Sequence, residues 1–407
     1  MKSIQDYELY MSTKLMFGVG IASKAGEVLK KLGAKKIMIV TDQGVVKANL
    51  LDGIIQSLET VSMPFEIFDE VLPNAPLSKV YKGLENLRKK SCDYLLAVGG
   101  GSPIDTAKVI GCLATNPGPI HDYAGADKYS IPPLPIVAIP TTAGTGSEVS
   151  FSAVVYDEEA QYKFSVRSYL QLPKVALLDP QLLRATPSGL AAASGMDALT
   201  HCIEAYTSDW ANLMTDAYCK QNFYLVGRYL RRFVADPTDI EAASAMLQAS
   251  SLGAMAFNAA RVGLAHGLGL PLGTHFHLSH GLACGIALPP VMRYNLMACP
   301  ARFIDIAMGL EGSVQGNSEM EKAYCAVKAV ENLLNDCSVS VSLDLSNENE
   351  ELLSILAEET LKTGLQISNP RKASKNDVIN IYKDLFQAMS TNGNYKLGVN
   401  AVPTFNR

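Results

Sequence analysis

The histidines of this chain are few and clustered, and one pairs with an acidic residue at helical spacing. The chain contains six histidines, of which four lie within the fifteen residues that begin at His266. A fifth, His201, follows Asp197 by four residues, so the two side chains would share one face of a helix. A carboxylate with two or three imidazoles suits iron(II) or zinc. The pattern predicts a divalent metal site, although Asp197 and His201 alone are equally well explained as a surface pair on an ordinary helix.

A glycine-rich segment follows a pattern typical of a buried strand. Residues 93–98 are mostly apolar, three glycines follow at 99–101, and Ser102 and Pro103 then begin a helical pattern. Glycines let the backbone approach a ligand closely, and the N–H groups at a helix start suit phosphate oxygens. The segment matches neither GxGxxG nor a Walker A motif. It predicts a phosphate-binding turn, with a glycine turn that binds nothing as the alternative.

Two further strand patterns end in polar residues. Residues 135–140 lead into a loop rich in Thr, Gly and Ser at 141–148, and residues 36–41 lead into Asp42. The carboxyl ends of parallel strands are where nucleotides bind in open α/β sheets. An acid at such an end can accept the adenosine ribose hydroxyls and would repel a 2′-phosphate. Asp42 also precedes a helical stretch, so it is equally a candidate N-cap, and the two roles are compatible.

The elements needed to position these residues divide into two sets. Strand and helix patterns alternate as far as Pro180, whereas almost every segment from Ser188 to about residue 388 has helical spacing and good helix formers. We therefore predict an α/β fold with a Rossmann-like parallel-sheet domain at residues 1–186 and an all-helical domain at residues 187–407. The irregular residues 392–407 are expected to form a surface tail.

Composition restricts the classes of partner. The formal net charge of −5 over 407 residues argues against nucleic acid or an acidic membrane surface as a partner. No apolar run is long and uncharged enough to span a bilayer, and no secretory signal pattern opens the chain. The eight cysteines contain no CxxC pair, which suits free thiols in a reducing cytoplasm. The expected partner is a small-molecule substrate.

Taken together, these motifs resemble those of a known family. The chain is similar to the iron-dependent (group III) alcohol dehydrogenases, the family of lactaldehyde reductase and 1,3-propanediol dehydrogenase, over residues 10 to about 390. The segments that carry the resemblance are Gly99–Lys108, Pro140–Glu148, Gly195–His201, Ala265–Gly267 and Ser279–Gly281.

The resemblance implies a metal in the cleft between a nucleotide domain and a helical domain. It implies NAD(H) as the cofactor, iron(II) or else zinc as the metal, and a homodimer or larger homo-oligomer. The implied metal ligands are Asp197, His201, His266 and His280. The implied cofactor residues are Asp42, Asn74, Gly100, Gly101, Ser102, Thr141, Thr142 and Lys163.

One position departs from the family pattern. Family members usually carry a second histidine four residues after the first ligand of the later pair, and this chain has Leu270 there. That histidine is often assigned to proton transfer or cofactor placement. His275 and His277 are the candidates to replace it as the general acid, and a water chain through the cofactor ribose is the other option.

The resemblance also indicates a substrate pocket. Ser152 and Phe257 fall where the family lines this pocket, and Arg261 lies on the same predicted helix as Phe257. Arg261 is either a surface or helix-pairing residue or a clamp for an anionic group. The expected function is hydride transfer between NAD(H) and a short-chain alcohol or aldehyde, in the direction of aldehyde reduction, with a carboxylate, sulfonate or phosphonate aldehyde as the sharper hypothesis. The alternatives are a glycerol dehydrogenase-like polyol enzyme of the same fold and a non-catalytic descendant.

Overall fold

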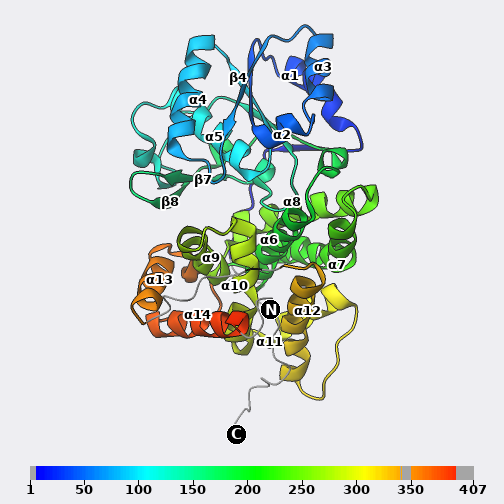
Figure 1. The fold of residues 1–407 in the computed structure, drawn as a ribbon, viewed down its shortest axis with the longest axis vertical. Coiled ribbons are helices and arrows are strands. Elements are labelled where there is room, and N and C mark those ends of the chain that lie inside the picture. Colours follow the sequence, from blue (N-terminus) through cyan, green and yellow to red (C-terminus); the bar gives the residue numbers. More distant parts are fainter. Residues whose placement is uncertain (1–5, 340, 342–349, 391–407) are drawn as a thin grey trace.

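The computed structural model describes residues 6–339, 341 and 350–390, so the expected tail at 392–407 lies outside the described residues. A parallel-sheet half and a helical half are stacked along the long axis of the molecule (Figure 1). The predicted fold class is confirmed. The turn between them contains the predicted boundary at residue 186, and the boundary itself stays a prediction.

The first half is built on a six-stranded sheet in which every pairing is parallel. Its strands lie in the order β1 (Lys14–Phe17), β9 (Val175–Leu178), β6 (Ile136–Pro140), β4 (Tyr94–Gly99), β2 (Ile37–Asp42) and β3 (Phe65–Val71). The chain leaves β2 toward one edge of the sheet and returns to β4, from which it proceeds toward the other edge. The order therefore reverses between β2 and β4, and this is where ligands bind in such sheets.

Both faces of this sheet are buried, which explains why its strands are nearly all apolar. Along β2, Met38 and Val40 pack on one face, and Ile37 and Ile39 pack on the other. The first face is covered by α4 (Leu77–Lys90) and α5 (Gly101–Thr115), and the second by α1 (Ala25–Lys31) and α3 (Asp52–Thr60). Each helix puts an apolar stripe against the sheet, so the carboxyl ends of the strands are held rigidly.

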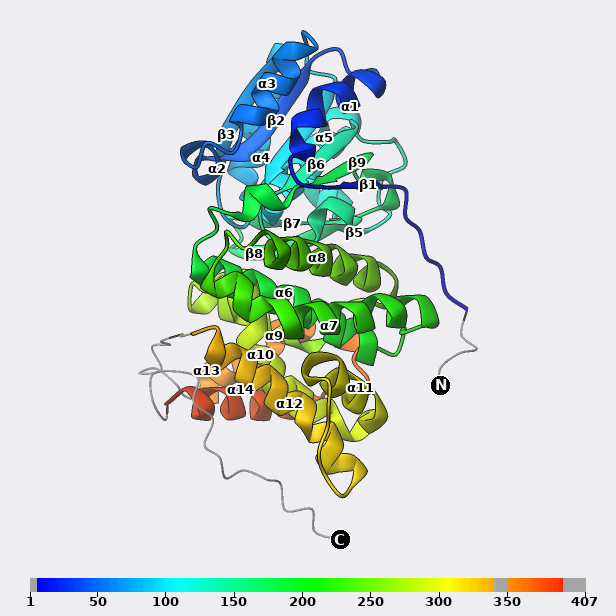
Figure 2. The ribbon, with the colours of Figure 1, turned by 90° about the vertical axis from the view of Figure 1, so that its right-hand side faces the viewer.

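A second, smaller sheet lies between the large sheet and the helical half (Figure 2). Its strands are β5 (Gly125–Ala126), β8 (Tyr162–Arg167) and β7 (Ser152–Asp157), in that order. The antiparallel pairing of β7 with β8 sets Ser152 opposite Arg167 and Tyr156 opposite Lys163. Opposite residues project from the same face of a sheet, so these four side chains share one face.

The second half is a bundle of helices around one large apolar core. Its helices are α6 (Ser188–Thr207), α7 (Leu213–Ala235), α8 (Ile240–Ala260), α9 (Leu264–His275), α10 (His280–Asn295), α11 (Pro300–Glu311), α12 (Glu319–Asp336), α13 (Glu350–Lys362) and α14 (Lys375–Ser390). Every residue of α6 from Ala191 to Thr207 is buried, so α6 lies at the centre of the bundle.

Two features concern the molecule's surface. Among the helices that the structure describes, none combines the length and the apolar character needed to cross a membrane. Residues 6–13 run from β1 along the helical half (Figure 2), where the Tyr218 hydroxyl on α7 lies 3.7 Å from the sulfur of Met11. The segment from residue 6 to β1 therefore contacts both halves.

Candidate metal and dinucleotide site

Helix α6 supplies the first pair of the predicted ligands. Asp197 and His201 are both buried, one turn apart on the face that meets α9 and α10. The close packing of α6 depends on small residues: a Cβ on Gly195 would stand 2.2 Å from Cδ1 of Leu230 on α7. This packing holds α6, and the two side chains on it, in a fixed position.

Helices α9 and α10 bring the second pair to the first. Oδ1 of Asp197 lies 4.0 Å from Nε2 of His201, 3.7 Å from Nε2 of His266 and 3.8 Å from Nε2 of His280. The rings of His201 and His266 are stacked with centroids 4.6 Å apart. The structure thus brings together the four residues singled out from the sequence, although they come from three helices.

The donor atoms fit a divalent cation. Oδ1 of Asp197 and Nε2 of His266 are buried, and neither has a hydrogen-bond partner among the described residues. Buried polar atoms without partners are rare and costly, and a metal ion would satisfy several at once. One carboxylate and three imidazoles are an accepted ligand set for iron(II) or zinc.

Burial sets the charge of most of these groups. Burial lowers the pKa of His201 to about 3 and that of His280 to about 4. Burial alone would raise the pKa of Asp197, but the nearby imidazoles of His201, His280 and His266 outweigh it and hold that pKa well below its usual range. At neutral pH the site therefore offers an ionised carboxylate and neutral imidazoles at His201 and His280, as metal binding requires.

His266 differs because a second carboxylate holds its other ring nitrogen. Nδ1 of His266 lies 2.6 Å from Oε2 of Glu204, and Oε1 of Glu204 accepts the backbone N–H of Ala265 at 2.5 Å. Burial alone would lower the pKa of His266, but Glu204 and Asp197 outweigh it and raise the pKa to about 9. A carboxylate on Nδ1 fixes the ring so that Nε2 faces the other ligands.

Sequence reasoning missed Glu204 and also Cys284. Glu204 lies on α6 three residues after His201, and an acid in an otherwise apolar, buried stretch was the available signal. Cys284 follows His280 by one helical turn, and its sulfur lies 3.7 Å from Nδ1 of His280. It belongs to a group of potential ligands with Asp197, His266 and His280 whose atoms lie within 4.8 Å of one another. Burial raises the pKa of the Cys284 thiol well above its usual range, so the sulfur is a neutral neighbour.

The two candidate general acids lie apart from this group. His275 and His277 are both exposed, and Nε2 of His275 lies 3.0 Å from Oε2 of Glu359 on α13. Among the described residues, no hydrogen bond or ring contact joins either histidine to the four ligands. Leu270 is half-buried on α9, one turn after His266. Assignment of a general acid to His275 or His277 stays a prediction.

The predicted phosphate-binding turn lies at the carboxyl end of β4. Helix α5 begins at Gly101 after an N-cap, Gly100, that offers no side-chain cap, so the first N–H groups of α5 have no side-chain acceptor there. A Cβ on Gly100 would stand 3.1 Å from Oγ1 of Thr142, and one on Gly101 would stand 2.8 Å from Cγ2 of Thr145. The glycines therefore let the loop after β6 approach the turn. The backbone N–H of Thr141 donates to the carbonyl of Gly99 at 3.0 Å and joins the two strand ends.

Asp42 reaches the same turn from β2. Its Oδ1 accepts the N–H groups of Gly44 and Val45 at 2.8 and 3.0 Å, so Asp42 caps α2 (Gln43–Lys47) as expected. Its second oxygen, Oδ2, lies beside the predicted phosphate turn: a Cβ atom added to Gly99 would be 3.4 Å from it. The cap uses Oδ1 only, so Oδ2 takes no part in it and lies beside the glycine turn.

Asn74, Ser102 and Lys163 meet on the other side of the turn. The backbone N–H of Asn74 donates to Oγ of Ser102 at 3.1 Å, and Nζ of Lys163 donates to Oδ1 of Asn74 at 2.9 Å. Burial lowers the pKa of Lys163. If a Cβ atom were added to Gly273 of α9, it would lie 3.7 Å from Nζ of Lys163. The side chain of Lys163, which comes from the first half, therefore reaches the helical half.

The three predicted substrate residues lie on β7 and at the end of α8, and one of them contacts a predicted metal ligand. The ring of Phe257 on α8 contacts the ring of His201 with centroids 4.7 Å apart. Arg261 follows Phe257 by one turn and caps α8, its backbone N–H donating to the carbonyl of Phe257 at 2.8 Å. Ser152 begins β7 and is half-buried. Sequence reasoning did not single out Arg167, which lies opposite Ser152.

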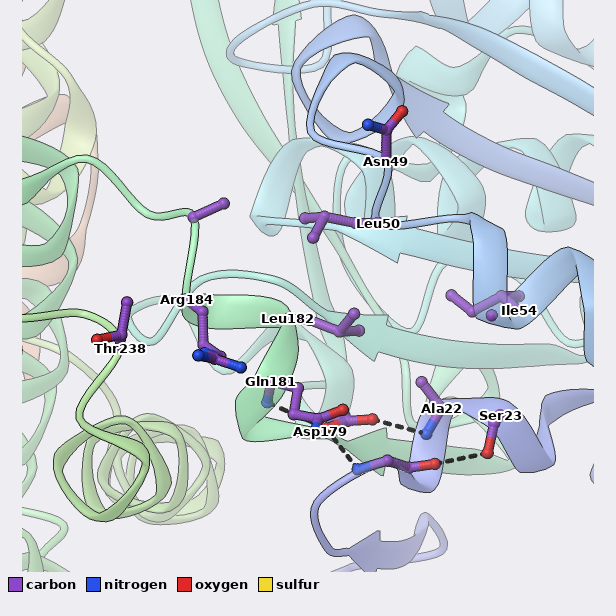
Figure 3. A pocket seen from close by; sticks show the side chains of 13 residues that line it. Ala22, Ser23, Asn49, Leu50, Ile54, Asp179, Gln181, Leu182, Arg184 and Thr238 are labelled. Atoms are coloured by element: carbon purple, nitrogen blue, oxygen red, sulfur yellow. Dashed lines mark hydrogen bonds between the residues drawn. The ribbon is translucent and has the colours of Figure 1, made fainter.

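A cavity of about 540 Å³ lies elsewhere at the carboxyl edge of the large sheet (Figure 3). Its wall comes from the segments after β1 and β9 and the turn between α2 and α3, with Asp179 accepting the N–H groups of Gly20 and Ala22 at 3.0 Å. None of its thirteen lining residues is a predicted site residue. Thr238, which precedes α8 in the helical half, also lines it, and none of the four predicted metal ligands does.

The chain is similar to known proteins along almost its whole length. The model of the iron-containing alcohol dehydrogenase family matches residues 12–180, and the model of the C-terminal part of that family matches residues 191–386. The 1,3-propanediol dehydrogenase of Citrobacter freundii is 40% identical over 372 residues, which cover 91% of this chain and 96% of that protein.

Solved structures indicate the same family. A structure of 1,3-propanediol oxidoreductase superposes with a TM-score of 0.90 at 38% identity, covering 94% of this chain and 100% of that one. A sulfoacetaldehyde reductase from Bifidobacterium kashiwanohense, solved in complex with NAD+, superposes with a TM-score of 0.84 at 26% identity, covering 94% and 99%. Family models, a curated relative and solved structures therefore agree with the clustered ligands and the glycine turn: this chain belongs to the iron-containing alcohol dehydrogenase family.

Proposed function

We propose that this protein reduces short-chain aldehydes with NADH at a single divalent metal, iron(II) or else zinc. The observation that carries the proposal is the convergence of three imidazole nitrogens on one buried, unpartnered oxygen of Asp197. When bound, the metal supplies a Lewis acid that polarises the substrate oxygen, and NADH supplies the hydride. His201, His266 and His280 would hold the metal with Asp197, and Glu204 would keep the ring of His266 oriented.

The dinucleotide would lie along the carboxyl ends of β2, β4 and β6. Gly100, Gly101 and Ser102 would hold the pyrophosphate at the start of α5, with Thr141 and Thr142 beside it. Asp42 would accept the ribose hydroxyls, which favours NAD(H) over its 2′-phosphorylated form. Asn74 and Lys163 would contact the cofactor from the facing side of the turn. The solved sulfoacetaldehyde reductase, which carries NAD+, supports this assignment.

The sharper part of the proposal is that the aldehyde carries an anionic group. Ser152 and Phe257 would line the substrate pocket, and Arg261 would bind a carboxylate, sulfonate or phosphonate. A guanidinium presents paired donors that match these groups. A structural neighbour that bears the name of a sulfoacetaldehyde reductase is in keeping with such a substrate.

We also propose that the protein acts in the cytoplasm as a homodimer or larger homo-oligomer. All eight cysteines are free thiols in the structure, and six of them are buried, which suits a reducing compartment. The oligomeric part rests on the family resemblance, and light scattering of the purified protein would test it.

The test is reconstitution of the metal-free protein. The stripped protein is reloaded anaerobically with iron(II) or zinc, and NADH oxidation is followed with propanal, 3-hydroxypropanal, 3-oxopropanoate and sulfoacetaldehyde. We expect turnover that depends on the metal and is lost in Asp197→Ala. Absence of turnover with every aldehyde and either metal would overturn the dehydrogenase proposal. Equal turnover of charged and neutral aldehydes would overturn only its anionic part.

A further inference from the structure

A second arginine, Arg167, comes from the other half of the molecule, and Tyr169, two residues after it, lines a cavity together with Arg261. Arg167 is the last residue of β8, and Arg261 is the C-cap of α8 with φ +67° and ψ 164°, a backbone conformation that is strained for a residue other than glycine. Burial and the positive charge of Arg261 lower the pKa of Arg167 and outweigh the negative charge of Asp127, which raises it, so each guanidinium lies within the other's field. Two like charges at close range destabilise each other unless an anion lies near both.

The Nε atoms of the two arginines lack partners in the part of the chain that the structure describes. The Nε atoms of Arg167 and Arg261 are both buried, and neither has a hydrogen-bond partner among the described residues. The guanidinium of Arg261 packs over the ring of Trp210 with its carbon 4.7 Å from the ring centroid. Stacking on an aromatic ring orients a guanidinium and leaves its edge, where the N–H donors lie, free for a ligand.

An open cavity adjoins this pair. It has a volume of about 480 Å³, and its wall includes Arg261, Trp210, Tyr169 and Asn258. Arg167 itself is not part of the wall, but Tyr169, two residues later, is. Two carboxylates, Asp6 and Glu8, also line the cavity. Among the described residues, neither of them forms an ion pair with Arg167 or Arg261, and Asp127, whose charge acts on Arg167, forms none with it either.

The same pair is connected to the reacting end of the site. Arg167 shares a sheet face with Ser152 and with Lys163, which contacts Asn74. Arg261 follows Phe257 by one turn, and the ring of Phe257 lies against His201. Strand β8 thus carries both Lys163, a predicted cofactor residue, and Arg167. Helix α8 carries Phe257, which contacts a predicted metal ligand, and ends next to Arg261. A short substrate anchored at the arginines would extend from them toward these residues.

We propose that Arg167 and Arg261 together form the anion subsite of the substrate pocket and favour a tetrahedral oxyanion, a sulfonate or phosphonate, over a carboxylate. This proposal rests on the proposed function and specifies its substrate class. A carboxylate has two oxygens, and a guanidinium that binds both side by side leaves a second guanidinium only their remaining lone pairs and no free oxygen. A sulfonate or phosphonate has three, so both guanidinium groups can bind the same group, and Arg167 becomes a specificity-determining residue.

The experiment measures binding without turnover. Metal-loaded enzyme with NADH is titrated with 2-hydroxyethanesulfonate, 3-hydroxypropanoate or 1,3-propanediol, and cofactor fluorescence reports the dissociation constant. We expect the sulfonate to bind most tightly and the diol least. Arg167→Gln and Arg261→Gln should each weaken sulfonate binding roughly ten- to a hundredfold, because each removes hydrogen bonds to a charged group. Arg228→Gln, an exposed arginine over Tyr229 on α7, is the matched control and should change nothing.

Thermal unfolding distinguishes a lost site from a lost fold. Removing one of two like charges should not lower the melting temperature, and the sulfonate should raise that of the wild type more than that of the double variant. Arg167→Lys keeps the charge but loses the paired donors, so it should recover only part of the sulfonate affinity. Sulfonate binding no tighter than diol binding, or unaffected by Arg167→Gln, overturns the proposal. Failure of the proposed function would appear separately, as absence of turnover with neutral and charged aldehydes alike.

Discussion

His266 is the ligand whose surroundings differ most from those of its neighbours, because it lies between Asp197 and Glu204. Its pKa of about 9 means that the metal-free protein carries a proton on this ring at neutral pH, whereas burial keeps His201 and His280 neutral. A metal must displace the proton from Nε2, so protons compete with the metal at this one residue.

Zinc binding at pH 7.5 should therefore release about one proton per site, and the affinity should fall about tenfold for each pH unit below pH 9. Titration calorimetry in two buffers with different ionisation enthalpies measures the released proton. Glu204→Gln removes the main cause of the raised pKa, so proton release should shrink toward zero. The same change should lower metal affinity roughly 10–100-fold, as losses of such supporting carboxylates do. Zinc binding by the wild type without proton release would contradict this account.

The ligand geometry depends on how closely α10 approaches α6. A Cβ on Gly281, next to the ligand His280, would stand 2.5 Å from the backbone carbonyl oxygen of Ala193 and 3.0 Å from Cβ of Asp197. A backbone atom cannot rotate away, so the two helices would have to separate.

Gly281→Ala should lower the stability by about 1–3 kcal/mol, the usual cost of overpacking, and should reduce the metal content as well. Gly189→Ala is the matched control, since nothing lies within 4 Å of its added Cβ in the first turn of α6. That change should stabilise the protein by about 0.5–1 kcal/mol. Thermal unfolding and metal analysis of both variants make the comparison; equal effects would show that the approach of α10 to α6 is not tight.

The positions of the site residues on these elements explain which of them could be predicted from the sequence. Asp42, the glycine turn and the helical pair of Asp197 and His201 were accessible because strand ends and i,i+4 spacing are local patterns. The contact of Glu204 with His266 joins residues 62 positions apart, and the approach of Arg167 to Arg261 needs the register of β8. Neither relation is marked by a pattern of neighbouring residues in the sequence. Cys284 is marked by such a pattern, because it follows His280 by four residues, one turn of a helix. Isolated buried cysteines are too common, however, for that spacing to be informative.

The two halves of the molecule hold different ligands in the proposed enzyme. The dinucleotide residues lie mainly at strand ends of the first half, and all four metal ligands lie in the second. Lys163 is the exception, since it reaches toward α9.

Metal-free protein should therefore still bind NADH, with an affinity within roughly threefold of the metal-loaded form, because separate sites act nearly independently. Fluorescence titration of the stripped protein measures this. Asp42→Asn keeps an N-cap residue, so it should weaken NADH binding while leaving the metal content unchanged. A complete loss of NADH binding on metal removal would mean that the halves are coupled more strongly than their contacts indicate.

The pairing of β1 with β9 has a consequence for synthesis of the chain. Lys14–Phe17 hydrogen-bond along Val175–Leu178, so β1 has no sheet partner until about 160 more residues have been synthesised. At ordinary rates of translation that interval lasts roughly ten to thirty seconds. Met11, before β1, gains its contact later still, because its partner Tyr218 lies on α7. The nascent protein therefore carries β1 as an unpaired strand until β9 has been made, and in that interval chaperones that bind extended segments would find it.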